Sequence, residues 1–265
     1  MGNLYYPQLT SGALAQYPLR KTTITRTIRN VLPDGNMILL PDAGAGRTIW
    51  QLEYSNLSLT DVQYLQTHFT ACNGPLTAFT FIDPTGNMLV SSTDLSAAAW
   101  QKSSLLQVQS GTSDPFGGTA AQTVTNYGQD IQELTQLLNV PANYQYCFSF
   151  YASAIEQTNV EVFRRGPNSQ QSTQMTVYSG WNRLVFGGRL NDSGSTLTVG
   201  ISLGAGTQVK IFGVQLEAQI SPSRYQPTNR TGGVYTNAHW AIEQLQITAE
   251  DINSYATTVI VEAAV

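Results

Sequence analysis

Apolar and polar residues alternate along most of this chain, but the stretch from Thr48 to Pro84 changes its period twice. Its first part, TIWQLEYSNL, alternates as a half-buried strand does. Its middle begins with Ser58 and Asp61 at the spacing of a capping box and then repeats apolar residues at helical spacing as far as Gly74. Alternation resumes in the last part. We therefore predict a strand, one short helix over about 58–73, and a second strand of the same sheet.

The residues before this stretch predict an extended arm followed by two strands. Thr22–Arg29 alternates over its whole length, and its Arg and Thr content suits a strand with one wet or partner-facing side. Leu32-Pro33-Asp34-Gly35 is a turn sequence, because proline presets φ and glycine supplies φ > 0. Met37–Leu40 is the short return strand. We expect a β-hairpin here.

The character of the chain changes between Thr85 and Trp100, where a region without long helices begins. From there to Arg230 we count roughly seven alternating stretches at the spacing of a β-sandwich. In Tyr146–Ala152, for example, Tyr151 falls on the face opposite Phe150. The other clear stretches are Val160–Arg165, Gln174–Tyr178, Arg183–Phe186 and Leu197–Leu203.

Two more strands are predicted at the end of the chain, Trp240–Ile247 and Ala256–Ala263, with a turn over 248–253. A two-stranded hairpin is only marginally stable by itself, and the first 88 residues hold few strands for a closed sandwich. We therefore predict one domain made of residues 1–88 together with 233–265, into which a domain of residues 89–232 is inserted. The expected fold is mainly β, with a split β-sandwich or barrel domain carrying the short helix and an inserted β-sandwich.

Composition narrows the function classes. Only 11% of the residues are charged, against roughly a quarter in ordinary soluble domains, and Thr, Ser, Gln and Asn fill the polar positions. The hydrophobic content of 42% argues against disorder, and a net charge of −4 without a basic stripe argues against nucleic-acid recognition. We find no apolar run near the ~20 residues of a membrane span and no secretion signal in MGNLYYPQLT. We expect synthesis in a cytoplasm.

No catalytic or metal-binding signature is found, and we expect no catalytic residues, no metal and no cofactor. Gly44-Ala45-Gly46 and Gly204-Ala205-Gly206 lack the third glycine of a dinucleotide loop and are interpreted as turns. His68 and His239 lie in unrelated contexts, and no cluster has zinc spacing.

Glycoside hydrolysis needs two carboxylates that flank a sugar, and Glu161 and Glu217 could meet across a sheet. The simpler interpretation is that Glu217 anchors the last strand of the sandwich and that Glu161 alternates onto a polar face. We therefore expect a protein that is not an enzyme. Cys72 and Cys147 are interpreted as buried free thiols, with a disulfide left as the alternative.

Glycan binding fits the residues better. Tyr151, Phe163 and Tyr178 are predicted to share a face, where aromatic rings stack on sugars while Arg165, Arg183 and Glu161 bind hydroxyl groups. An equal alternative is that these aromatic residues cover a second sheet or a neighbouring subunit. Trp100 and Trp181 are expected in the core.

Two parts of the chain resemble known protein families, and each resemblance implies a function. YPQL at Tyr6–Leu9, the W-x-L-x-Y strand from Trp50 to Tyr54 and the acidic-proline end at Asp83-Pro84 resemble the N-terminal domain of phage tail proteins of the distal-tail or minor-tail type. Five spaced motifs resemble the jelly-roll carbohydrate-binding modules of phage tail and spike proteins. They are S-x-x-x-L-S-x-A-A-W at Ser91–Trp100, Asp114–Gly118, Y-x-F-S-x-Y at Tyr146–Tyr151, Trp181–Arg183 and GVQLEAQISPSRYQPT at residues 213–228.

The resemblances imply a structural virion protein of a tailed phage or phage-like particle. It would form a homo-oligomeric, hexameric distal-tail ring at the tail tip, between the tail tube protein and the hub or baseplate proteins. The inserted jelly roll would contact a host-surface glycan. Candidate ring contacts are Arg26, Arg29, Tyr64 and His68. The alternatives are a trimeric tail-fibre or spike adhesin and, less favoured, a polysaccharide-degrading tail enzyme. The protein would be assembled in the host cytoplasm and located in the virion.

Overall fold

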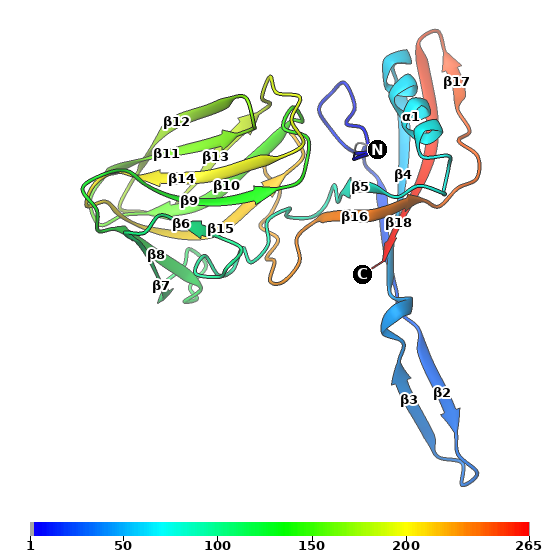
Figure 1. Cartoon of the computed structure of the whole chain (residues 1–265), viewed down its shortest axis with the longest axis horizontal. Helices are drawn as coiled ribbons and strands as arrows, with labels where there is room; N and C mark the ends of the chain where they lie inside the picture. The colour runs from blue at the N-terminus through cyan, green and yellow to red at the C-terminus, as the bar shows by residue number, and fades with distance from the viewer. Residues whose placement is uncertain (1–2, 265) are drawn as a thin grey trace. The chain divides into compact units, whose positions relative to one another are not determined.

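The computed structural model describes residues 3–264 and divides the chain into two compact units. Unit 1 consists of Met1–Phe81 and Tyr235–Val265, and unit 2 is Ile82–Val234. Strands dominate both units, and residues 3–264 contain one α-helix (Figure 1), so the prediction of a mainly β fold with one short helix is confirmed. The division expected at residues 88/89 and 232/233 falls a few positions inside unit 2.

Unit 1 is built around a sheet with strands from both ends of the chain. Its order is β1 (Leu19–Ile24), β4 (Arg47–Leu57), β18 (Ser254–Ala264), β16 (Val234–Trp240) and β5 (Phe79–Ile82), and β17 (Thr248–Asp251) also pairs with β18. In the central pair, Trp50 lies opposite Val261 and Leu52 opposite Val259. All four side chains are fully buried. One face of β4 and β18 therefore forms the floor of the core.

The helix α1 (Leu59–Ala71) covers this core and begins where the capping pattern predicted. Asp61 N donates to Ser58 Oγ at 3.1 Å, and Ser58 N donates to Asp61 Oδ2 at 3.1 Å. Thr10 N adds a hydrogen bond of 2.7 Å to Asp61 Oδ1, which ties the N-terminal segment to the helix. The helix is followed by Gly74, whose φ of +62° suits glycine.

His68 lies inside this core, so its predicted role as a surface ring contact is wrong. Its side chain is buried against Phe79, with ring centroids 4.7 Å apart, and accepts a hydrogen bond of 3.2 Å from Trp240 Nε1. Burial lowers the pKa of His68 from 6.5 to about 4, because the charged imidazolium is poorly solvated there. The folded state therefore favours the neutral ring.

The predicted hairpin exists, but the expected single strand over 22–29 is divided in two. β1 pairs with β4, whereas β2 (Thr27–Val31) pairs only with β3 (Met37–Pro41) and forms a separate two-stranded sheet. The break falls at Thr25 and Arg26, opposite Asp42 and the short 3₁₀ helix Ala43–Ala45. We call residues 27–41 the arm, because they project away from the rest of unit 1 in Figure 1.

The C-terminal prediction is correct for the last strand and wrong before it. β16 ends at Trp240, where a strand was expected to begin, and residues 241–247 lie outside strands. β17 occupies part of the predicted turn over 248–253. Trp240 lies on the core side of β16, where its ring contacts Phe69, and the alternation of residues 241–247 does not correspond to a strand.

Unit 2 is a β-sandwich of two five-stranded antiparallel sheets, which confirms the sandwich predicted for this region. The first sheet has the order β13 (Asn182–Gly188), β10 (Tyr146–Ser153), β15 (Gln208–Glu217), β8 (Ala121–Asn126) and β7 (Leu106–Thr112). The second has the order β12 (Gln170–Val177), β11 (Thr158–Arg165), β14 (Leu197–Leu203), β9 (Gln132–Leu138) and β6 (Gln101–Lys102). The chain passes repeatedly between the sheets, as in a jelly roll.

The core of unit 2 comes from alternate positions of these strands. Phe148 and Phe150 of β10 and Val162 of β11 are buried, as strand alternation requires. Trp100 is buried as expected, and its Nε1 donates to Ser91 O at 3.0 Å. Trp181 is only half-buried, so its assignment to the core is wrong.

The environment of His68 makes the stability of unit 1 dependent on pH. Because the folded-state pKa lies below 6.5, the contribution of His68 is complete above pH 6.5 and is lost as the pH falls toward 4. We expect a loss on the order of 3 kcal/mol across this window. His68→Gln, which does not titrate, should remove it, while His239→Gln should retain it.

The measurement is native-state hydrogen exchange of β4 and β18 peptides between pH 4 and 6.5, corrected for intrinsic exchange. This readout isolates unit 1 from unit 2, which a global unfolding curve does not. An unchanged pH slope in His68→Gln would contradict the assignment.

Candidate functional site

The outer face of the first sheet of unit 2 carries a row of large side chains. Tyr151 of β10 lies opposite Arg183 of β13 on one side and opposite Phe212 of β15 on the other. Directly opposite residues of antiparallel strands share a face, so these three side chains are neighbours. The register shifts next to Tyr151, where Gly213 has a φ of +64° and forms a bulge.

Four rings meet at this bulge, and we call Phe116, Tyr151, Phe212 and Tyr225 the aromatic cluster. The ring centroid of Phe116 lies 5.5 Å from that of Tyr151 and 5.8 Å from that of Phe212, both edge-on. Phe212 and Tyr225 are 5.4 Å apart. A Cβ at Gly213 would lie 3.3 Å from both Tyr151 and Tyr225, so the glycine lets both rings rest against the backbone.

Phe116 is the most exposed member of the cluster, at 69%. Its loop is held by the carboxylate of Asp114, which accepts hydrogen bonds from the backbone N–H groups of Phe116 (2.8 Å), Gly118 (3.1 Å) and Ala120 (3.1 Å). These hydrogen bonds, of which the one from Ala120 has the largest effect, keep the pKa of Asp114 below its ordinary value. The exposed ring is therefore presented by an ordered turn.

Polar groups surround the cluster. The Arg183 guanidinium lies 5.5 Å from the centroid of Tyr151 and donates to Ser149 Oγ at 3.0 Å and to Ser223 O at 2.6 Å. Lys210 lies opposite Ser153 and opposite Thr123, in the next row of the same face. Arginine, lysine and hydroxyl side chains thus flank the rings.

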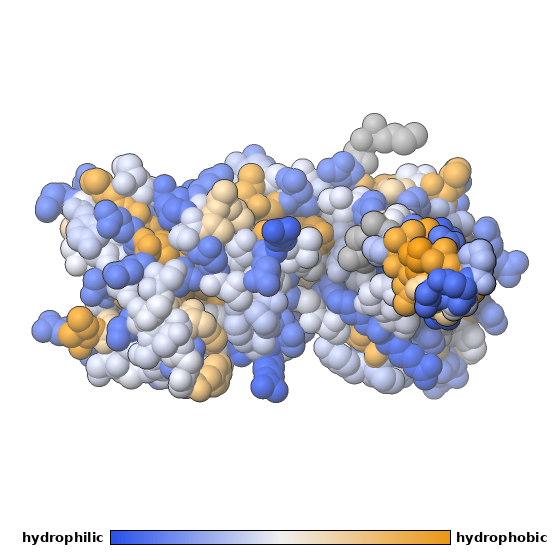
Figure 2. All heavy atoms as spheres, turned by 90° about the horizontal axis from the view of Figure 1, so that it is seen from below, coloured by the Kyte–Doolittle hydropathy of each residue, from blue (hydrophilic) through white to orange (hydrophobic). Residues whose placement is uncertain are grey.

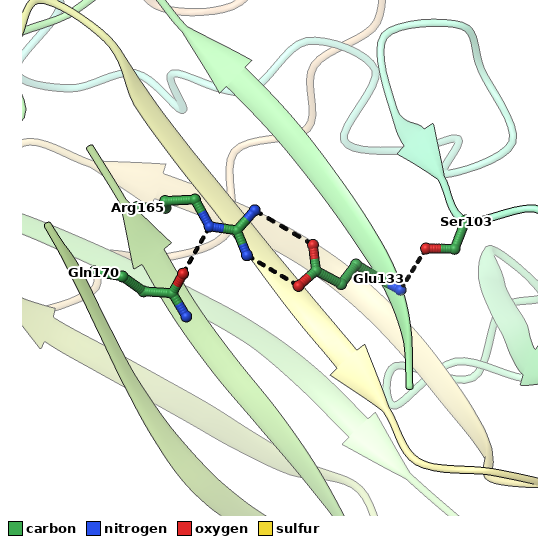
Figure 3. Close-up of polar contacts among 4 residues, drawn as sticks. All are labelled: Ser103, Glu133, Arg165 and Gln170. Atoms are coloured by element: carbon green, nitrogen blue, oxygen red, sulfur yellow. Dashed lines mark hydrogen bonds and ion pairs between the residues drawn. The ribbon is translucent and has the colours of Figure 1, made fainter. Parts of the chain in front are cut away.

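The second sheet has a different outer face, centred on an ion pair (Figure 3). Arg165 Nη2 lies 3.0 Å from Glu133 Oε1, and Nη1 lies 3.5 Å from Oε2. Arg165 Nε donates to Gln170 Oε1 at 2.6 Å, and the backbone N–H of Glu133 donates to Ser103 Oγ at 2.9 Å. The two charged side chains are partly exposed, at 41% and 35%.

Phe163 lies beneath this ion pair and is only 1% exposed. Its ring extends toward Gly200, where a Cβ would lie 2.6 Å from Cζ, and the Arg165 guanidinium covers it at 4.7 Å from the centroid. A ring in this position supports Arg165 and is inaccessible to a sugar. Its predicted role as a stacking platform is therefore wrong.

The single face predicted for the six glycan-binding candidates is also wrong. Tyr151 and Arg183 belong to the first sheet, whereas Glu161, Phe163 and Arg165 belong to β11 of the second. Tyr178 follows β12 and is 50% exposed. Alternation along each strand was correctly interpreted, but it cannot indicate which strands share a sheet.

Glu161 and Glu217 likewise lie in different sheets. Glu217 is 2% exposed and accepts hydrogen bonds from Ser223 N (3.0 Å), Ser223 Oγ (2.5 Å) and Gln215 Nε2 (2.6 Å). It holds the segment that follows β15 against the sheet, as the sequence suggested. The two carboxylates do not flank a common site.

Other predicted residues have simple surroundings. Arg26 is exposed and forms an ion pair with Asp42, Arg29 is exposed on β2, and Tyr64 is 48% exposed on α1. Cys72 and Cys147 are buried free thiols in different units.

Residues 3–264 hold no group of three or more His, Cys, Asp or Glu that could bind a metal ion. In the same range, no helix is long and apolar enough to cross a membrane.

Sequence reasoning missed Phe116, Phe212, Tyr225 and Glu133. Phe116 had a usable signal, because an aromatic residue between Asp-Pro and Gly-Gly stands in a turn and cannot lie within a core strand. Phe212 had none, since the bulge at Gly213 reverses the face that simple alternation assigns. Glu133 and Arg165 are far apart in sequence and meet only through the β9–β14–β11 pairing.

Part of the chain is similar to several solved structures. The enzymatically active domain of bacteriophage CBA120 tailspike protein 4 is 11% identical over 52% of this chain, with a TM-score of 0.41, and the match spans 22% of that domain. The CBM22-1 xylan-binding domain from Paenibacillus barcinonensis Xyn10C is 15% identical over 53% of this chain and 99% of its own, with a TM-score of 0.41.

The C-terminal family 22 carbohydrate-binding module of Clostridium thermocellum Xyn10B is 20% identical over 51% of this chain and 96% of its own, with a TM-score of 0.40. No protein-family model and no curated protein matches the chain.

The space at Gly200 is required for the packing of Phe163. In Gly200→Ala the new methyl group would meet Phe163, Thr135 and the carbonyl oxygen of Leu134, all within 3 Å. We expect a loss of about 1–3 kcal/mol in the free energy of unfolding of unit 2. Gly180→Ala, where no atom lies within 4 Å, is the matched control and should change little.

Urea unfolding followed by hydrogen exchange of β11 and β14 peptides measures both variants. Equal stability of Gly200→Ala and Gly180→Ala would show that Phe163 can move aside without cost.

Proposed function

We propose that unit 2 binds a glycan at the aromatic cluster and does not hydrolyse it. The observation that carries this proposal is the Phe116 ring, 69% exposed on a turn fixed by Asp114 and packed edge-on against Tyr151 and Phe212. Exposed, immobilised rings stack on the apolar faces of sugars at little cost in side-chain entropy.

The surroundings favour a glycan over a purely apolar ligand. Lys210 and Thr123 offer a cation and a hydroxyl group on the same face as Tyr151 and Phe212, and such groups bind sugar hydroxyls. A cavity lined in part by Phe212 and Tyr225 has a volume of only about 20 Å³. A ligand here would lie along the surface, as an extended glycan chain can.

For the whole chain, we propose a structural virion protein at the tail tip of a tailed phage or phage-like particle. In this proposal unit 1 forms the distal-tail ring between tail tube and hub proteins, and unit 2 contacts the host glycan. The tail-type motifs of the N-terminal region and the five jelly-roll motifs support it.

A trimeric fibre or spike adhesin is the second candidate, because it would need the same glycan contact. Class averages of the purified chain or of intact particles by electron microscopy, viewed down the long axis, distinguish the two. A six-fold ring supports the distal-tail proposal, and a three-fold particle contradicts it in favour of the adhesin.

Removing the exposed ring tests glycan binding directly. Phe116→Ala and Tyr151→Ala should each weaken binding by about ten-fold or more, because each deletes a stacking surface. Tyr127→Ala is the matched control, since Tyr127 is 62% exposed in unit 2 but lies outside the cluster. A glycan array identifies the ligand, and calorimetry measures the affinity of each variant.

Arg165→Gln separates the two outer faces. It breaks the ion pair with Glu133 and should leave glycan affinity unchanged if the aromatic cluster is the site. Loss of binding in Arg165→Gln but not in Phe116→Ala would place the site on the second sheet. Release of reducing ends from the bound glycan would contradict the non-enzymatic part of the proposal.

A further inference from the structure

The arm exposes apolar side chains on both of its faces. In the register of β2 and β3, Val31 lies opposite Met37 and Arg29 opposite Leu39, so these four share one face. Val31, Met37 and Leu39 are 69%, 55% and 57% exposed. The other face carries Ile28, Ile38 and Leu40, which are less exposed, at 45%, 42% and 45%. Figure 2 looks toward this part of the molecule and shows apolar residues gathered beside polar ones.

The arm also lacks support from its own chain. Among residues 3–264, β2 and β3 pair only with each other, and all their residues are exposed. A hairpin of two strands is marginally stable in water, and an exposed apolar sheet face favours association. An additional surface that covers the Val31 face would therefore stabilise the arm.

A groove on unit 1 offers a surface on which polar and apolar side chains are mixed. It has a volume of about 630 Å³ and lies on the face of β4 and β18 opposite the core, where Glu53, Thr258 and Ile260 point. Gln246 and Glu250 line its side. A space of this volume accommodates several side chains.

The charges of the two surfaces are complementary. The lining of the groove includes two carboxylates, Glu53 and Glu250, and neither lysine nor arginine. The arm carries Arg29 in the middle of its more exposed apolar face, and its carboxylate, Asp34, lies in the turn and accepts hydrogen bonds from Asn36. Opposite charges at a partly buried interface fix the register and orientation of the partners.

We propose that the arm of one copy of this chain docks into the groove of the next copy. Val31, Met37 and Leu39 would then lie against Ile260, and Arg29 would lie near Glu250. The arm and the groove are different surfaces, so the contact is heterologous and repeats from copy to copy around a closed ring. This inference deepens the ring assembly of the proposed function and rests on it, because it names the surfaces that join neighbouring subunits.

Two variants of the full-length chain test the apolar contact. Val31→Asp combined with Leu39→Asp places charges on the docking face and should shift the protein from oligomer to monomer in light scattering coupled to size exclusion. Ile155→Asp, at a position 77% exposed in unit 2, is the matched control and should remain oligomeric. Circular dichroism and native-state hydrogen exchange of the β4 and β18 peptides confirm that unit 1 of each variant is folded.

A charge reversal tests the groove itself. Arg29→Glu and Glu250→Arg should each raise the dissociation constant of the assembly about ten-fold or more, and the double variant should recover a large part of that loss. Failure of the double variant to recover would overturn the pairing of arm and groove. An oligomer that survives the Val31/Leu39 variant would do the same.

The outcomes separate this inference from the proposed function. A ring that persists without the arm contact overturns the inference and leaves the distal-tail proposal standing. A wild-type chain that stays monomeric at high concentration overturns the inference and leaves a different virion protein as the partner of the arm. Glycan binding is measured in every variant and bears only on unit 2.

Discussion

The pairing of β4 with β18 is the constraint on which unit 1 depends. It joins residues near both ends of the chain, and its central pairs, Trp50 with Val261 and Leu52 with Val259, are fully buried. β1 attaches to the sheet through β4, and β16 and β17 attach through β18. Without this pair, β1 would be separated from β16 and β17, and the sheet would not form. The whole of unit 2 must therefore be synthesised before unit 1 can close, and the closure brings together segments separated by a long loop.

On the two outer faces of unit 2, similar aromatic residues differ in their exposure to solvent. On each face an aromatic ring rests against a glycine, Phe163 against Gly200 and Tyr151 against Gly213. On the second sheet the Arg165 guanidinium, held by Glu133, covers the ring and removes it from solvent. On the first sheet the ring meets Phe116 edge-on, and the aromatic surface stays accessible. The neighbour that covers the ring, and not the ring itself, therefore decides whether its aromatic surface is buried or accessible.

The low charge of the chain has a structural consequence in unit 1. The strand β1 carries Arg20 and Lys21, which protect an exposed edge, whereas the more exposed apolar face of the arm carries Arg29 as its one charge. The arm keeps apolar side chains on both faces, while the groove concentrates two of the few carboxylates of unit 1 in one place. These features underlie the proposed contact with another copy of the chain.

The sequence by itself determined the local elements. The Ser58–Asp61 capping box predicted the helix, the Leu32–Gly35 turn predicted the hairpin, and alternation predicted most strands of the sandwich, because these signals act between residues close in sequence. Alternation also placed Tyr151 correctly on the face opposite Phe150. It could not place Tyr151, Phe163 and Tyr178 relative to one another, since sheet membership is fixed by pairing between distant strands. The tertiary structure alone decided that His68 is buried, that Phe163 is covered and that Phe116 joins Tyr151, because each of these depends on side chains that approach from far along the chain.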